Sequence, residues 1–254
     1  MKKPIILLTN DDGYGSRGLQ ALAQELQGFA RVAIAAPSWE RSGAAQSLTL
    51  RQPIVCHKIA ENEWAIDGTP ADCVIVALHK LLPEPPDLVI SGINQGANLG
   101  ENVYYSGTVG AAREAVIHEV RGLAVSLCSK DVNADFAPTA RLAKQTAELI
   151  LSEGLQEQVL LNINVPEKWK GEVRFTRQSK KITRTILREG EDPRGTPYYW
   201  LSEQRVEPDL ELDADSDYAA IYAGEASVTP LHLDPTHAES LNHLSHWAAK
   251  LRRV

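Results

Sequence analysis

Residues 5–18 of the chain read IILLTNDDGYGSRG, an uninterrupted apolar run that ends in two adjacent carboxylates and a glycine-rich turn. The apolar run predicts a buried strand that is covered on both faces. Its abrupt end places Asp11 and Asp12 at the carboxyl end of that strand, the edge at which open α/β sheets bind their ligands. Two neighbouring carboxylates repel each other, and a proton or a cation relieves the repulsion. The stretch therefore indicates a divalent-metal site, although Asp-Gly is also ordinary turn chemistry.

Short apolar runs of this kind alternate with amphipathic stretches along the first two-thirds of the chain. We predict strands over 4–9, 30–36, 87–91, 122–128 and 158–164. We predict helices over 17–28, 70–82, 107–120 and 136–152, and short antiparallel strands within 47–67. Thr69-Pro70 favours a helix start, because threonine is a good N-cap and proline suits the first helical position. Strands that alternate with helices are typical of an α/β fold with a mainly parallel sheet.

The pattern changes after about residue 166. Residues 171–187 alternate, turn signals follow at Asp192-Pro193 and Gly195, and an acidic run comes next. We read this region as an extended β-hairpin excursion followed by an acidic loop. A further strand over 224–231 and a helix over 237–251 close the chain.

We predict one domain over 1–254, with a core of about 1–166 plus 224–254 and an arm of about 170–223. The arm is a poor candidate for an independent core, yet it carries Tyr198, Tyr199 and Trp200. Apolar side chains that an arm cannot bury by itself are usually buried on a partner subunit. The arm therefore predicts a homo-oligomer.

Composition narrows the class of protein. The formal net charge of −7 disfavours binding to a nucleic-acid polymer, because proteins that bind such polymers are usually basic. The three cysteines are widely spaced and form neither a disulfide framework nor a zinc pattern, which favours a reducing compartment. The first apolar run is too short for a signal peptide, and no run reaches the length of a membrane span. We expect a cytoplasmic protein with no membrane partner.

Oxygen donors follow three of the predicted strands. Asp11 and Asp12 follow the first strand, Ser42 follows the second, and Asn94 and Asn98 follow the third. Because the loops of a parallel sheet meet at one edge, we expect these side chains to converge. Carboxylate, carboxamide and hydroxyl oxygens suit Mg²⁺ or Mn²⁺ and suit zinc poorly. Judged singly, the asparagines are equally well explained as turn residues.

A candidate anion site comes directly before the predicted helix at 107–120. Ser106, Gly107 and Thr108 open that helix, and hydroxyls with exposed N–H groups at a helix N-terminus bind anions. The plain alternative is an N-cap with no ligand. An anion site beside a cation site indicates phosphate-ester chemistry.

Three other classes of protein with acidic residues after the first strand fit this sequence less well. A haloacid-dehalogenase phosphatase needs the spacing DxD after its first strand, and a response-regulator receiver needs an aspartate after its third strand. A zinc-dependent sugar deacetylase needs histidine at the acid pair, where Thr9 and Asn10 stand. The histidines near the C-terminus have no cysteine or carboxylate partners at metal-ligand spacing; they are His232, His237, His243 and His246.

Seven ordered motifs resemble the SurE family of survival-protein nucleotidases. They run from residue 5 to about 230 and read LLTNDDGYGSRGLQAL, AAPSWERSGAAQSLTL, DGTPADCV, PDLVISGINQGANLG, YYSGTVGAAREA, LNINVP and RFTRQ. The resemblance implies a Rossmann-like α/β domain with an extended, subunit-exchanging C-terminal region that forms dimers or tetramers. It implies one divalent cation per subunit, Mg²⁺ or Mn²⁺. One departure is Ser38, where members usually carry Asp or Asn, and we expect the metal site to tolerate it.

The resemblance also implies residue roles and an activity. The metal ligands would be Asp11, Asp12, Ser42 and Asn94, and the phosphate-binding residues would be Asn98, Ser106, Gly107 and Thr108. The expected activity is that of a 5′-nucleotidase, which hydrolyses nucleoside 5′-monophosphates and also 3′-monophosphates, sometimes with exopolyphosphatase activity. Asp11 and Asp12 are the candidate catalytic residues. We favour attack by water, and the role of Asp12 as general base or nucleophile stays open.

Two other classes of function are alternatives to an enzyme. A nucleotide-sensing module would bind a phosphorylated ligand in this pocket without turning it over. A scaffold built around the exposed hairpin would respond to neither metal nor ligand. Release of phosphate from a nucleotide separates the enzyme from both.

Overall fold

The computed structural model describes residues 2–180, 183–205 and 213–251. Within this part of the chain, one sheet has the strand order β3-β4-β2-β1-β5-β6-β7-β11-β8, and β9 and β10 form a separate hairpin. The strands are β1 (Ile5–Thr9), β2 (Arg31–Pro37), β3 (Cys56–Ala60), β4 (Glu63–Ile66), β5 (Leu88–Gln95), β6 (Arg121–Cys128), β7 (Val159–Pro166), β8 (Val173–Phe175), β9 (Thr183–Glu191), β10 (Pro197–Arg205) and β11 (Ala226–His232).

The central strands of the sheet are parallel. The run β4-β2-β1-β5-β6-β7 is parallel throughout, whereas β3 is antiparallel to β4 and β11 is antiparallel to β7. The chain first builds outward from β1 to β2 and then returns to the other side of β1 with β5. The strand order therefore reverses between β1 and β5, and ligands bind at such a switch point in open α/β sheets.

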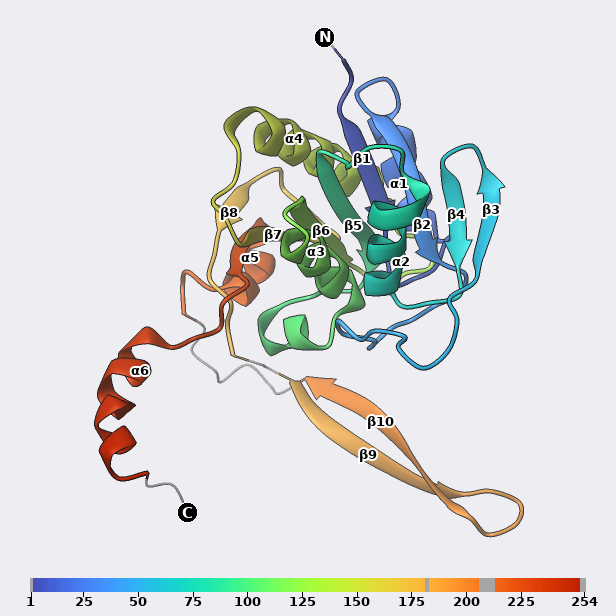
Figure 1. Ribbon diagram of the computed structural model, residues 1–254. Coiled ribbons are helices and arrows are strands. Elements are labelled where there is room, and N and C mark those ends of the chain that lie inside the picture. The colour runs from blue at the N-terminus through green and yellow to red at the C-terminus, as the bar shows by residue number, and fades with distance from the viewer. Residues whose placement is uncertain (1, 181–182, 206–212, 252–254) are drawn as a thin grey trace.

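Helices cover both faces of the sheet (Figure 1). They are α1 (Arg17–Leu26), α2 (Pro70–Val76), α3 (Gly107–Ile117), α4 (Ala137–Glu153), α5 (Asp217–Ala223) and α6 (Ala238–Leu244). Alternate residues of β1 point to opposite faces of the sheet. Ile6 and Leu8 pack in a hydrophobic core with residues of α1 and α4, and Leu7 packs in a second core with residues of α2 and α3. Every residue of β1 is buried. The predicted doubly wound α/β fold is confirmed.

The helix start predicted at Thr69-Pro70 is confirmed, and α1 also begins at a side-chain cap. Thr69 and Asp72 form a capping box at α2, with Pro70 in its first turn. Ser16 caps α1 by accepting a hydrogen bond from the N–H of Leu19. The predicted helix over 70–82 is α-helical only to Val76, because residues 77–81 continue as a π-helix.

The third predicted strand is longer than expected. The prediction ends it at residue 91, but β5 continues to Gln95 and pairs again with β6 at Asn94 and Gln95. Between Ser91 and Asn94 the pairing register shifts, and the Gly92–Ile93 peptide bond is cis. Two glycines, a serine and an asparagine give SGINQG the composition of a loop, although residues 91–95 belong to the strand.

The hairpin of β9 and β10 projects from the body of the molecule (Figure 1). Two segments of the predicted arm lie in the body instead, because β8 pairs with β11 and α5 packs against β11. Residues 181–182 and 206–212 of the predicted arm lie outside the described residues. The predicted C-terminal helix consists of α6 and a 3-10 turn over Ser245–Ala249. Among the described helices, none is long and apolar enough to cross a membrane.

Candidate active site

The carboxylate pair lies at the switch point between β1 and β5. Asp11 is buried, and Asp12 is partly exposed. The hydroxyl of Thr108, in the first turn of α3, donates a hydrogen bond to Asp11 Oδ1. The backbone N–H of Gln95, the last residue of β5, donates to Asp12 Oδ2 at 3.0 Å. Two elements that follow β1 by more than eighty residues therefore orient the two carboxylates.

The surroundings disfavour negative charge on both aspartates. Burial raises the pKa of Asp11, and the hydrogen bond from Thr108 acts in the opposite direction. Burial raises the pKa of Asp12 to about 6, opposed by the N–H of Gln95 and reinforced by the charges of Asp11 and Glu40. A cation placed between the two side chains would relieve this cost.

This electrostatic cost predicts an effect on stability. Between pH 3.8 and about 6 the folded chain retains the Asp12 proton that the unfolded chain loses, so stability falls as the pH rises and the full penalty is present above pH 6. With EDTA present at pH 7.5, Asp12→Asn is expected to raise the free energy of unfolding by about 1–3 kcal/mol. The gain should shrink toward pH 4. Urea unfolding at the two pH values measures it.

The control for that measurement is Asp192→Asn. Asp192 accepts hydrogen bonds from the N–H groups of Arg194 and Thr196, which lower the pKa of its carboxyl group. Removing that charge is expected to destabilise the chain at pH 7.5. If Asp12→Asn were no more stable than the unsubstituted chain in EDTA at pH 7.5, the electrostatic argument would be wrong.

Asn94 and Ser42 are the other two predicted metal ligands. Asn94 Nδ2 donates to the carbonyl oxygen of Gly96 at 2.7 Å, and no hydrogen bond within the described ranges occupies its Oδ1. The loop that carries Ser42 is attached to the pair, because the N–H of Arg41 donates to the carbonyl oxygen of Asp11 at 2.7 Å. The Ser42 hydroxyl itself is exposed and donates to Glu40 Oε1 at 2.8 Å.

The donor set fits a hard cation. In the described part of the chain no three His, Cys, Asp or Glu side chains form a metal cluster, so amide and hydroxyl oxygens would have to complete the ligands of the carboxylate pair. Three buried oxygens without a partner among the described residues lie at the end of β1 or beside it, where Ser91 of β5 pairs with Thr9: Thr9 Oγ1, Asn10 Oδ1 and Ser91 Oγ. Oxygen donors with room for water are what Mg²⁺ requires.

The N-terminus of α3 adjoins Asp11. Ser106 caps this helix by accepting a hydrogen bond from the N–H of Val109 at 3.1 Å. Gly107 lies so close that a Cβ built on it would be 2.9 Å from Asp11 Cβ. The positive end of a helix therefore faces the carboxylate pair, and an anion bound there would lie beside a cation bound to Asp11.

Asn98, a predicted phosphate-binding residue, is held in a network of buried polar groups. Its Nδ2 donates to Ser126 Oγ at 2.9 Å, and its N–H donates to Asn164 Oδ1 at 2.8 Å. Its carbonyl oxygen accepts from the side chains of Asn162 and Asn164. Asn162 and Asn164 are absent from the predicted site residues, although two asparagines inside the apolar run LLNINV are a signal that could have identified them.

Ser38, which departs from the family pattern, is turned away from the carboxylate pair. Its hydroxyl donates to Asp67 Oδ1 at 2.5 Å, at the end of β4. The described contacts of Asp11 and Asp12 do not depend on it.

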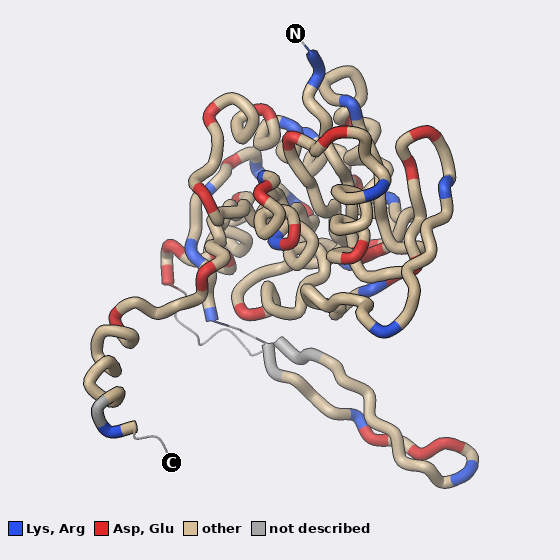
Figure 2. Tube along the Cα trace, in the orientation of Figure 1, with Lys and Arg blue, Asp and Glu red and all other residues tan. Residues whose placement is uncertain are grey.

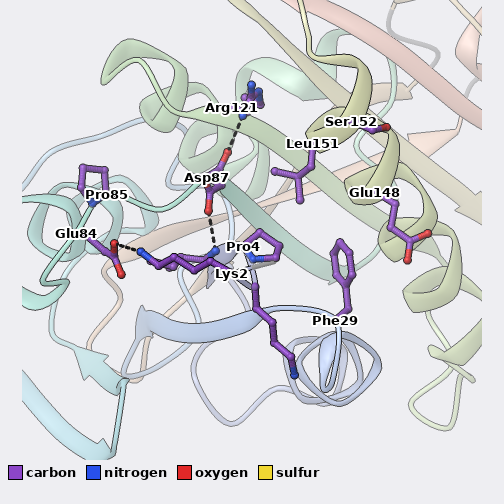
Figure 3. Close-up of a pocket in the computed structure, with 12 residues that line it drawn as sticks. Lys2, Pro4, Phe29, Glu84, Pro85, Asp87, Arg121, Glu148, Leu151 and Ser152 are labelled. Carbon is purple, nitrogen blue, oxygen red and sulfur yellow. Dashed lines mark hydrogen bonds and ion pairs between the residues drawn. The ribbon is translucent and has the colours of Figure 1, made fainter.

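A surface hollow at the opposite edge of the sheet is separate from the candidate active site (Figure 3). It lies at the N-terminal ends of β1, β5 and β6, and several of its charged groups have structural partners. Lys2 pairs with Glu84 at 2.6 Å, and Asp87 accepts the N–H of Ile5 at 2.8 Å. This hollow contains neither the carboxylate pair nor the N-terminus of α3.

Fold and site together define a doubly wound α/β protein with a carboxylate pair and a helix N-terminus at its strand switch point. Residues 6–185 match the family described as Survival protein SurE. A 5′-nucleotidase SurE from Pelobacter propionicus is 42% identical over 245 residues, covering 95% of this chain and 98% of that protein. Another, from Vibrio parahaemolyticus, is 43% identical over 252 residues, covering 96% and 95%. The chain belongs to the SurE family.

A solved structure agrees with this assignment. The SurE protein from Aquifex aeolicus has a TM-score of 0.84 and 37% sequence identity, covering 96% of this chain and 100% of that one. The family resemblance predicted from the motifs is therefore confirmed.

Proposed function

We propose that this chain is a 5′-nucleotidase, a metal-dependent phosphomonoesterase that converts nucleoside 5′-monophosphates, and 3′-monophosphates, to nucleoside and phosphate. The observation that carries the proposal is the carboxylate pair at the N-terminus of α3, where the buried Asp11 accepts a hydrogen bond from Thr108 in the first turn of the helix. Relatives described as 5′-nucleotidase SurE, similar over nearly their whole length, support the reaction class.

The carboxylate pair would hold one Mg²⁺ or Mn²⁺ per subunit, with Asn94 and Ser42 as further ligands. When bound, the cation polarises a phosphate oxygen and lowers the pKa of a bound water. Thr108 and the N–H of Gln95 fix the orientation of the two carboxylates. The hydrogen bond that Ser42 donates to Glu40 leaves the lone pairs of its hydroxyl oxygen free for the cation.

The N-terminus of α3 would bind the phosphate. The partial positive charge of the helix N-terminus and the hydroxyl hydrogen of Ser106, whose oxygen accepts the N–H of Val109, would stabilise the negative charge that phosphate oxygens gain in the transition state. Asn98 would contribute the second hydrogen of its amide nitrogen, since the first is donated to Ser126. We assign the attack on phosphorus to water.

The decisive experiment measures phosphate released from AMP and GMP by the purified chain. We expect release with Mn²⁺, a fall of about 10³-fold or more in EDTA, and recovery when Mn²⁺ is restored, because Lewis-acid stabilisation contributes several kcal/mol. A rise in melting temperature on adding AMP, with no phosphate released under any condition, would instead establish a nucleotide sensor.

The proposal includes a cytoplasmic location and a small-molecule substrate. The cysteines of the chain, Cys56, Cys73 and Cys128, are free, which supports a reducing compartment. Lys and Arg are interspersed with Asp and Glu along the body (Figure 2), which supports a nucleotide rather than a nucleic-acid polymer as the ligand.

We further propose that the hairpin of β9 and β10 joins subunits into a homodimer or homotetramer. A two-stranded hairpin is marginally stable alone in water. This one exposes large apolar side chains that a partner subunit would cover: Leu187, Tyr199, Trp200 and Leu201. One partner hairpin packed against it would bury them.

Replacing residues 183–205 by a short Gly-Ser linker is expected to reduce the mass in solution to that of the monomer, measured by light scattering. The variant Trp200→Ser/Leu201→Ser, which keeps the hairpin, should weaken the assembly without unfolding the chain. Retention of the full-length mass after the replacement would exclude the hairpin as the assembly element.

A further inference from the structure

Trp39 is a large aromatic side chain that is exposed next to the carboxylate pair. It lies in the loop after β2, and 52% of its surface is accessible. This loop is held against the turn after β1, because the N–H of Arg41 donates to the carbonyl oxygen of Asp11. A Cβ built on Gly13 would lie 3.2 Å from the carbonyl carbon of Trp39. The indole therefore projects from backbone that contacts the turn of the active site.

The indole is held by a cation. The guanidinium carbon of Arg41 lies over the ring, 5.1 Å from its centroid, a cation–π geometry. Arg41 Nε is buried and makes no hydrogen bond within the described residues, and the charge of the guanidinium also interacts with Asp67. The guanidinium lies against the ring while about half of the residue's surface stays accessible.

No packing role explains this side chain. Trp39 belongs to none of the buried clusters of the described chain, and its neighbours in the loop, Ser38 and Glu40, are polar. An indole of which half remains exposed gains only part of the hydrophobic stabilisation that full burial would give. Its surface is therefore available to a ligand that carries an apolar ring and a charged group.

We propose that Trp39 is the stacking platform for the nucleobase and makes the enzyme favour purine over pyrimidine nucleotides. This inference rests on the proposed function, because the phosphate must occupy the N-terminus of α3 for the base to reach the indole. Stacking on an aromatic ring tolerates every base but increases with the area of the ring. Arg41 acts as a positioning residue beneath the indole.

Tyr104 is the competing platform. Its side chain is 60% exposed, and it lies two residues before Ser106 on the approach to α3. Trp39 is favoured because its ring is larger and is held by a cation. Trp247, which is 51% exposed in the C-terminal segment, provides a control with the same residue type and exposure.

The test compares kcat/KM for AMP, CMP and ribose 5-phosphate, which has the phosphate and sugar but no base. In Trp39→Ala, the ratio of kcat/KM for AMP to that for ribose 5-phosphate is expected to fall about tenfold, mainly through KM, and the same ratio for CMP should fall less. Trp39→Phe should restore most of the loss. Trp247→Ala should keep the ratios of the unsubstituted enzyme.

Two kinetic outcomes would overturn the inference. One is an unchanged ratio of AMP to ribose 5-phosphate in Trp39→Ala, whether or not both substrates lose activity together. The other is loss of the base preference in Tyr104→Ala but not in Trp39→Ala.

A fluorescence titration separates failure of the inference from failure of the proposed function. AMP should quench Trp emission in the presence of Mn²⁺, and Trp39→Phe should lose that quenching. If no substrate is hydrolysed but the quenching assigned to Trp39 is present, the stacking site stands and the enzyme proposal fails. If AMP is hydrolysed and Trp39→Phe is quenched like the unsubstituted chain, the enzyme proposal stands and the stacking site is excluded.

Discussion

Asp11→Asn is expected to lower kcat/KM for AMP with Mn²⁺ by about 10³-fold or more. Asn can still accept the hydrogen bond from the Thr108 hydroxyl that Asp11 accepts, so the local geometry is preserved while the negative charge is removed. A cation site with one carboxylate fewer stabilises the transition state by several kcal/mol less. Each 1.4 kcal/mol changes the rate tenfold. Phosphate release at saturating and limiting Mn²⁺ measures the effect.

Stability distinguishes this loss from unfolding. Because burial raises the pKa of Asp11, the neutral asparagine should leave the chain in EDTA at least as stable as before. The matched control is Asp87→Asn at the opposite edge of the sheet, where the carboxylate accepts the N–H of Ile5. Asp87→Asn should retain activity. Metal-dependent activity within tenfold of normal in Asp11→Asn would remove Asp11 from the active site.

The positions of the strands could be predicted from the sequence because the interior strands are apolar on both faces. β1, β2, β6 and β7 each lie within two residues of the predicted range. The site prediction depended on the same regularity, since side chains that follow parallel strands meet at one edge. Asp11 and Thr108 are 97 residues apart in sequence, yet the strand order brings them into contact.

What could not be predicted depends on tertiary contacts rather than on pattern. The extension of β5 through Asn94 depends on pairing with β6, which overrides the loop-like composition of SGINQG. β8 is only three residues long and joins the sheet through β11, which comes some fifty residues later. Two asparagines in the apolar run LLNINV signal buried polar groups, but their partner, the carbonyl oxygen of Asn98, lies 64 and 66 residues away in sequence and no local pattern identifies it.

The site combines two requirements that oppose each other. Burial of Asp11 and the nearby Asp12 costs stability, and the N-terminus of α3 offsets part of this cost through Thr108. The same helix end must also remain accessible to a phosphate. Both requirements are met only if the helix approaches the carboxylate closely, and Gly107 is the residue that permits the approach.

Gly107→Ala is therefore expected to lower kcat/KM for AMP by about 10²-fold although it changes no predicted metal ligand. The new methyl group would lie 2.9 Å from Asp11 Cβ, 3.0 Å from Asp11 Oδ2 and 3.1 Å from Pro70 Cγ. Relief of these contacts must move Asp11 or the start of α3, and a displacement of about 1 Å at a reacting centre costs about 10²-fold. Steady-state kinetics and Mn²⁺ titration measure the loss.

Gly15→Ala is the matched control, because a Cβ on Gly15 meets nothing within 4 Å although it follows the same carboxylates. It should retain normal activity. Gly107 does not require the left-handed backbone conformation, so the alanine variant should fold, and its melting temperature checks this. Activity of Gly107→Ala within threefold of normal would show that the helix end and Asp11 need not be in contact during the reaction. If the folded Gly107→Ala variant loses both Mn²⁺ affinity and activity, the cation site depends on the close approach of the start of α3 to Asp11, which one added methyl group prevents.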